Sequence, residues 1–139
     1  MQLRHESQLT ADEYVKQKAW EGASLQKCPL HPAGGCGIAR HGTYGRVEPP
    51  GMEIARWYCK AGHTTFSLLP DCLAAKLSST LAAVEMVVDA VEQRESSLEA
   101  VAEKLRADIG VQGAVRWVRR RVLAVTLALV ALKGLCQTY

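Results

Sequence analysis

Cysteine and histidine side chains that could bind a metal ion occur in two groups along this chain. The first group, CPLHPAGGC, contains Cys28, His31 and Cys36, and the second, CKAGH, contains Cys59 and His63. Thiolate sulfur and imidazole nitrogen are preferred ligands of Zn²⁺, and a closed structural site needs four of them. The spacing therefore predicts a structural zinc site formed by Cys28, Cys36, Cys59 and His63.

The identity of the second ligand is left open between Cys36 and His31. Cys28 and His31 have a compact C-x2-H spacing, which makes His31 the alternative ligand. However, a Cys-Gly pair followed by a strand is the usual end of a zinc-ribbon knuckle, which favours Cys36. A catalytic zinc site is the third interpretation. It would keep one position open and use a nearby acid as base, and Glu53 is the only acid well placed in sequence for that role.

The segment that carries these ligands must hold them with little hydrophobic core. Three short runs at 38–47, 52–59 and 64–69 have the composition of strands, and EPPG separates the first two. About forty residues of short strands cannot bury a stable core unaided, and a structural metal is the usual remedy. We therefore predict a small zinc ribbon of short antiparallel strands over residues 25–70.

The rest of the chain has the pattern of helices. Thr10 with Glu13, and Ser96 with Glu99, form capping boxes, which are a sequence signature of a helix start. The expected helices lie at 10–21, 79–94, 96–106 and 112–134. These elements predict an α+β fold that is mostly α, with an N-terminal helix in residues 1–24, the zinc ribbon at 25–70 and a helical domain at 71–139.

Charge is unevenly distributed along the helical part. Residues 109–139 contain five Lys or Arg and no acid, whereas residues 71–108 contain four Lys or Arg and eight acids. A concentrated basic surface is the electrostatic footprint of a protein that binds a polyanion. Residues 96–122 also have the layout of a helix-turn-helix, with a Gly-containing turn at 108–110. Double-stranded DNA is therefore the expected partner, and the alternative is a plain helical hairpin with a solvated basic face.

In a helix-turn-helix, the N-terminal part of the second helix faces base edges in the major groove. Arg pairs with guanine and Gln with adenine, so we expect Gln112 and Arg116 to lie nearest the bases. The other basic residues are expected to contact phosphates, which position the protein without specifying sequence. They are Arg119, Arg120 and Arg121 on the second helix, and Arg40, Arg46, Arg56 and Lys60 on the ribbon.

An apolar seam runs along the final helix. Its residues alternate steps of three and four, which is the a/d pattern of a coiled coil, and it could pack on the helix at 79–94 or form a homodimer through residues 115–132. The members are Val115, Val118, Val122, Val125, Leu129 and Leu132. The uncharged run 122–132 has eleven residues, too few to span a bilayer, and the start of the chain lacks an apolar signal segment. We therefore expect no membrane association and a cytoplasmic, nucleoid-associated protein.

Three stretches of the chain together resemble a bacterial family. CPLHPAGGCGIARHGTYGRVEPPG, IARWYCKAGHTTFSLLPDCLAAKL and RWVRRRV are similar to transposon-associated proteins that join an N-terminal zinc ribbon to a helix-turn-helix. The ribbon portion is also similar to the one that precedes the DNA-binding helices of many insertion-sequence transposases. The resemblance covers roughly residues 10–135 and implies the same metal ligands, Cys28, Cys36, Cys59 and His63. The chain departs from the family at Gly62, where the commoner ribbon has Cys.

These features predict a non-enzymatic, zinc-containing DNA-binding protein that acts as a transposase-like accessory or regulatory factor. No catalytic residues are expected, because an acidic-triad transposase needs carboxylates converging on two metal ions, and no acid follows Asp108. A separate transposase or another protein is therefore an expected partner. The alternative is that the ribbon and the heptad seam form a protein-interaction and dimerisation module within a larger nucleoprotein complex.

Overall fold

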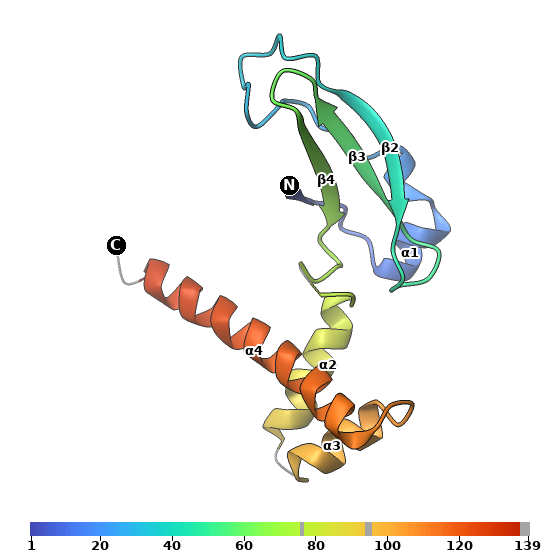
Figure 1. Cartoon of the computed structure of the whole chain (residues 1–139), viewed down its shortest axis with the longest axis vertical. Helices are drawn as coiled ribbons and strands as arrows, with labels where there is room; N and C mark the ends of the chain where they lie inside the picture. The colour runs from blue at the N-terminus through green and yellow to red at the C-terminus, as the bar shows by residue number, and fades with distance from the viewer. Residues whose placement is uncertain (76, 94–95, 137–139) are drawn as a thin grey trace. The chain divides into compact units, whose positions relative to one another are not determined.

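The computed structural model describes residues 1–75, 77–93 and 96–136, and it divides into two compact units, Met1–Leu81 and Ala82–Tyr139. The first unit holds a β-sheet with short helical turns, and the second is helical (Figure 1). Residues 1–24, which the sequence set apart as an N-terminal helix, lie within the first unit.

The first unit is organised around a four-stranded sheet in the order β1-β4-β3-β2. The strands are β1 (Gln2–His5), β2 (Ala39–Gly45), β3 (Glu53–Cys59) and β4 (Thr64–Pro70). β2, β3 and β4 form the predicted antiparallel meander, with Arg56 opposite Ser67 and Trp57 opposite Phe66. β1 was not predicted, and it pairs in parallel with β4.

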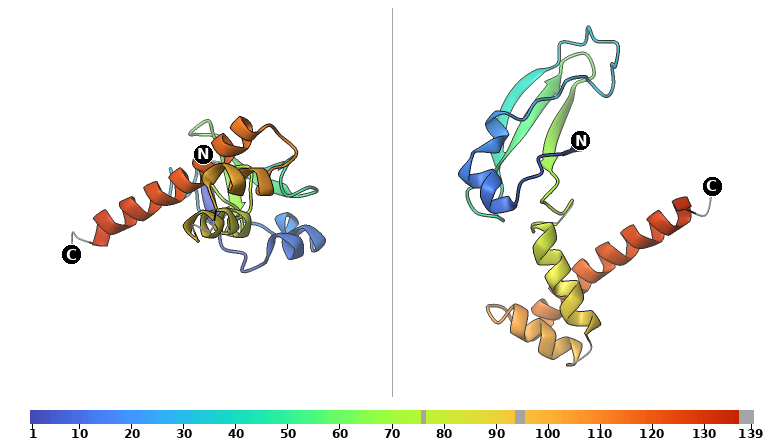
Figure 2. Two further views of the ribbon diagram at one scale, coloured as in Figure 1. Left: turned by 90° about the horizontal axis from the view of Figure 1, so that it is seen from below. Right: turned by 180° about the vertical axis from the view of Figure 1, so that it is seen from behind.

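A short helical segment packs on one face of this sheet (Figure 2). α1 (Ala11–Lys16) begins with the predicted capping box, in which Thr10 and Glu13 bond to each other's backbone N–H. Lys18 then adopts a left-handed φ of 49°, so the expected helix at 10–21 is divided into α1 and a 3-10 turn, η1 (Ala19–Glu21). Tyr14 and Trp20 are buried here against Ile54 and Leu68 and form the core of the unit.

The predicted fold class is wrong in its proportions and in its sheet. The structure is α+β, but it is only 41% helical against 22% strand, and the sheet is mixed rather than antiparallel. The mixed sheet results from β1, which pairs in parallel with β4. The four residues of β1 are too few to show a strand period, and the strand is fixed by pairing with residues more than sixty positions away, which local composition cannot reveal.

The second unit contains three helices, α2 (Leu81–Glu92), α3 (Leu98–Leu105) and α4 (Val111–Cys136). α3 begins at Ser97, whose side chain accepts a hydrogen bond from the N–H of Ala100, so the cap lies one residue after the expected Ser96. Val87 of α2, Ala102 of α3 and Val118 of α4 meet in a small core. The predicted sequence of helix, turn and long helix over 96–122 is therefore present as α3, residues 106–110 and α4.

α4 changes character along its length. Val115 and Val118, the first members of the heptad seam, are buried in the core of the unit. The large apolar side chains of its C-terminal half are exposed, and they are Leu123, Leu127, Leu129, Val130, Leu132 and Leu135. Among the described residues, the structure contains no helix that is both long and apolar enough to span a membrane.

Candidate metal centre

Within the described part of the chain, one group of Cys and His side chains could hold a metal ion. It consists of Cys28, His31, Cys36 and Cys59, whose ligand atoms all lie within 4.8 Å of one another. The three cysteines are buried, and His31 is half-buried. The structure therefore brings together both candidates for the second ligand, His31 and Cys36, rather than one of them.

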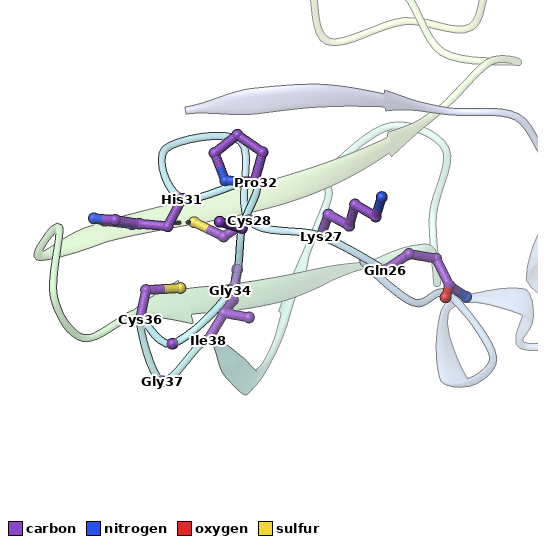
Figure 3. Close-up of a pocket in the computed structure, with 11 residues that line it drawn as sticks. Gln26, Lys27, Cys28, His31, Pro32, Gly34, Cys36, Gly37 and Ile38 are labelled. Carbon is purple, nitrogen blue, oxygen red and sulfur yellow. Dashed lines mark hydrogen bonds between the residues drawn. The ribbon is translucent and has the colours of Figure 1, made fainter.

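Two segments of the first unit position these four residues. Cys59 is the last residue of β3, at the entry to the hairpin into β4. The other three lie on the loop before β2 (Figure 3). This loop turns back twice, through hydrogen bonds from the His31 N–H to the Cys28 carbonyl and from the Gly34 N–H to the His31 carbonyl. Gly37 has a φ of 67°, and the Ala61 N–H donates to the Cys36 carbonyl, so the loop is fastened to the hairpin.

Two sulfur–nitrogen distances in the group are compatible with a common tetrahedral metal ion. Nδ1 of His31 lies 3.4 Å from Sγ of Cys59 and 3.7 Å from Sγ of Cys28. With Zn–S near 2.3 Å and Zn–N near 2.0 Å, a sulfur and a nitrogen bound to one tetrahedral ion lie about 3.5 Å apart. A Cys3His donor set of this size suits zinc, and Nδ1 is the ring nitrogen that faces the site.

Burial and hydrogen bonding shift the pKa values of the thiols in this group. Burial acts to raise the pKa of Cys28, but hydrogen bonds from the side chain of His31, the backbone of Leu30 and His31, and Cys59 lower that pKa to about 7. Burial raises the pKa of Cys36, and the neighbouring thiols of Cys28 and Cys59 add to the increase. Cys28 is therefore readily available as a thiolate near neutral pH, and a thiolate is the form that binds metal.

His63, which the sequence favoured as the fourth ligand, does not belong to this group. Its Nδ1 lies 3.2 Å from Oη of Tyr58, and its backbone has a left-handed φ of 45°. The C-x3-H spacing was within reach of one ion, but the turn of the hairpin directs the His63 ring to the tyrosine. His31 takes the place that the sequence gave to His63.

Gly62 lies directly beside the centre. Its N–H donates to Sγ of Cys59 at 3.2 Å, and a Cβ added at Gly62 would lie 3.3 Å from that sulfur and 3.5 Å from Cε1 of His31. A side chain at residue 62 would therefore point into this group of Cys and His residues. Cys36 supplies a third thiol from the opposite loop.

Two of the predicted DNA contacts in the first unit are engaged in internal hydrogen bonds. The Arg40 guanidinium donates to the carbonyls of Trp20, Glu21 and Ala23 at 2.6–3.1 Å. The Arg46 guanidinium donates to the carbonyls of Glu48 and Leu77 at 3.1 and 2.7 Å. These two side chains hold loops of the first unit in place. Arg56 is half-buried over the ring of Tyr44, and Lys60 is exposed.

The predicted contacts in the second unit divide between the surface and the interior. Gln112, Arg116 and Arg119 are exposed and line one groove on α4 together with Glu99 of α3. Arg120 is exposed, but it does not line this groove. Arg121 is only 5% exposed, and its guanidinium carbon lies 3.7 Å from the centre of the Trp117 ring.

The burial of Arg121 was not expected from the sequence. Its Nη1 donates to the Trp117 carbonyl, and within the described residues its Nε has no hydrogen-bond partner. The available signal was the i, i+4 spacing of Trp117 and Arg121, which allows a ring and a guanidinium to stack on one helix face.

Comparison of the chain with protein-family models, with curated proteins and with solved structures gave no match.

Proposed function

We propose that this chain is a non-enzymatic, zinc-containing DNA-binding protein that acts as an accessory or regulatory factor in a transposase-like system. In this proposal zinc fixes the loops of the first unit, and α3 and α4 of the second unit bind a duplex. The observation that carries it is the groove on α4, where Gln112, Arg116 and Arg119 project together from the helix that follows a short connection from α3.

The spacing of these three side chains supports a DNA-binding role for α4. Positions 112, 116 and 119 are four and three residues apart, so they share one helix face. α4 carries no acid over its whole length, and Gln and Arg are the side chains suited to reading adenine and guanine edges. Glu99 is the one acid in the groove, where it would meet either a cytosine amino group or a phosphate.

The metal is proposed to be structural. Three thiols and one imidazole around one point form a closed set of four protein ligands, the arrangement of structural rather than catalytic zinc. Cobalt substitution would count the thiolate ligands through the intensity of the sulfur-to-cobalt charge-transfer band. We expect three in the native protein, two in Cys36→Ser, and no change in His63→Ala. A loss of one ligand in His63→Ala would restore the ligand set read from the sequence.

The DNA proposal is tested by binding of the zinc-loaded protein to a labelled random-sequence duplex at about 50 and 200 mM salt. We expect affinity to fall steeply with salt. The double variant R116A/R119A should bind more weakly at both concentrations. It should lose about one unit of salt slope, because Arg119 is its one proposed phosphate contact and Arg116 is proposed to face the bases. Lys133→Ala is the matched control, because it removes one charge from the far end of the same helix. Binding that is insensitive to salt and to R116A/R119A would contradict the proposal.

A second candidate function is a protein-interaction and dimerisation module, and the exposed C-terminal half of α4 favours it. The heptad seam is buried at Val115 and Val118 but exposed at Leu129 and Leu132, where each side chain is about 60% exposed. A homodimer through this part of the seam, or contact with a separate transposase, would cover these side chains. Sedimentation at rising concentration tests the homodimer: wild type should associate, and Leu129→Lys should remain monomeric.

A further inference from the structure

The two faces of the sheet in the first unit are chemically different. Side chains alternate between faces along a strand, and partners directly opposite in register share a face. One face carries Ala55, Cys59 and Phe66, all fully buried. The other carries Ile54 and Leu69, which are buried, together with Arg56 and Tyr58 of β3 and the residues opposite them, Ser67 and Thr65 of β4. These last four side chains are only half-buried.

Aromatic and basic side chains gather on this second face, which we call the open face. The His41 and Tyr58 rings lie 5.5 Å apart between centroids, and the Tyr58 hydroxyl lies 3.2 Å from Nδ1 of His63. The Arg56 guanidinium lies 5.9 Å from the centre of the Tyr44 ring. These contacts come from β2, β3 and the hairpin that follows β3, so they form one continuous surface.

The open face has a positive balance. Arg4 of β1 lies opposite Leu69 and therefore projects from the same face as Arg56. Glu53 is the only acid among the residues of the four strands, and it lies on the opposite face, where it accepts a hydrogen bond from Thr43. A ligand on the open face would meet cations and aromatic rings without a neighbouring carboxylate from the strands.

We propose that the open face binds a short run of single-stranded DNA. A sheet surface with partly exposed rings offers stacking platforms for unpaired bases, and interspersed cations neutralise the backbone. Tyr58 is the central platform in this assignment, and Arg56 is the central cation. A duplex fits this surface less well, because its bases are stacked on each other and are not free to stack on the aromatic side chains of the protein. The inference rests on the proposed function in one respect: the helical unit would hold the adjoining duplex.

The test uses the full zinc-loaded chain and two labelled probes, a twelve-residue oligo(dT) and a random-sequence duplex. Tyr58→Leu removes the ring and keeps apolar bulk, whereas Tyr58→Phe keeps the ring and removes the hydroxyl that meets His63. We expect Tyr58→Leu to weaken oligo(dT) binding about tenfold, as expected for loss of one stacked base, and Tyr58→Phe to bind like wild type. Neither variant should change duplex binding. Zinc content and circular dichroism show that each variant is folded.

The outcomes separate this inference from the proposed function. Equal oligo(dT) affinity for wild type and Tyr58→Leu would overturn the open-face site, even with duplex binding intact. Loss of oligo(dT) binding in R116A/R119A would overturn it as well, because the single strand would then occupy α4. An oligo(U) probe that bound more tightly than oligo(dT) through Tyr58 would overturn the assignment to DNA. Tyr58-dependent oligo(dT) binding without duplex binding would support the open face and contradict the proposed function.

Discussion

The two units of this protein use their apolar residues in different ways. In the first unit, the large side chains of the sheet and its short helices are enclosed, with Tyr14, Ile54 and Phe66 fully buried. In the second unit, α4 begins in a core at Val118 and ends with Leu135 exposed. The large apolar side chains of the first unit are therefore mostly enclosed within that unit, whereas the C-terminal half of α4 leaves large apolar side chains exposed.

The two units differ in the residues that stabilise them. At the end of the sheet that holds Cys59, the buried cluster consists of three cysteines, Cys28, Cys36 and Cys59, and one large apolar side chain, Phe66. The helical unit has hydrogen bonds within its helices and a core of small residues such as Ala102 and Ala114. We expect the first unit to depend on its metal and the second to be indifferent to it.

Metal removal should produce the largest difference in stability between the two units. Chelation, or Cys59→Ser, should unfold the strands of the first unit and leave α4 helical, because structural zinc in small sites contributes about 10–16 kcal/mol of apparent binding free energy. Hydrogen exchange read residue by residue would show lost protection at β3 and β4 with retained protection in α3 and α4.

Cys72→Ser is the control for that experiment. Cys72 is half-buried and does not belong to the metal-binding group, so its variant should keep zinc and strand protection. Retention of β3 protection after complete chelation would show that the sheet does not need the metal.

A ligand exchange within the metal centre should have the next largest effect. Cys36→Ser should lower zinc affinity by at least about a hundredfold, since loss of a ligand exceeds the 10- to 100-fold effect of losing an outer-shell partner. Adding Gly62→Cys should restore much of this affinity, because a side chain at residue 62 points at Cys59 and His31. Leu30 must shift to admit the new side chain, since its Cδ1 would lie 2.7 Å from the added Cβ.

Competition with a chelating dye measures both affinities. Gly62→Ala in the Cys36→Ser background is the matched control, since it adds the Cβ without the sulfur. Equal affinities for the Cys and Ala variants would mean that residue 62 cannot replace Cys36.

The metal centre illustrates how far the sequence could be interpreted. Spacing and residue type were enough to bring Cys28, Cys36 and Cys59 into one predicted site. The sequence left His31 and Cys36 as alternatives for one place and took His63 as the fourth ligand. It could not show that His31 joins the group and His63 does not, because either spacing reaches a common ion only through a suitable turn. The outcome depends on the turn that gives His63 a positive φ and places its ring beside Tyr58.

The basic residues show a second limit of sequence reasoning. From the sequence alone, every arginine was taken as a surface cation. In the structure, however, Arg40 donates to the Trp20 carbonyl and Arg46 donates to the Leu77 carbonyl, both far away in sequence. Such partners are set by the sheet and its loops, so they become visible only with the fold. In the helical unit the order of helix, turn and long helix was predictable, because its capping and periodicity are local.

Two neighbouring arginines on α4 allow a smaller test within the second unit. Arg121 is buried against Trp117, whereas Arg120 is exposed. Arg121→Ala should destabilise the unit by about 1–3 kcal/mol through lost packing and cation–π contact. Arg120→Ala should change its stability by less than about 0.5 kcal/mol. Thermal unfolding followed through helix ellipticity measures both.

Arg121→Met separates packing from charge. It keeps most of the buried volume and removes a charge that burial disfavours, since burial lowers the pKa of Arg121. Its stability should equal or exceed that of wild type. A loss as large as that of Arg121→Ala would show that the guanidinium itself, and not its volume, stabilises the unit.

One aspartate in each unit allows a comparison in which the expected change in stability is small. Asp71 accepts hydrogen bonds from the hydroxyl and N–H of Ser7 and from the N–H of Gln8, and so joins segments more than sixty residues apart. Asp108 is largely exposed and pairs with Arg106, which lies two residues away and is half-buried. Asp71→Ala should raise hydrogen-exchange rates along β1 and β4 about fivefold, which corresponds to about 1 kcal/mol. Asp108→Ala should change exchange in α3 and α4 much less.

The pH dependence of the exchange difference between wild type and Asp71→Ala shows whether the Asp71 side chain acts as an ionised carboxylate. The bonds from Ser7, against a smaller effect of burial, hold the pKa of Asp71 below its usual value of 3.8. A carboxylate with a lowered pKa contributes stability that is present above the unfolded pKa and lost only as pH falls through the folded one. The difference between wild type and Asp71→Ala should therefore be constant from pH 6 to 8. A difference that changes within this window would mean that another titrating group, and not the Asp71 carboxylate, fastens β1 to the end of β4.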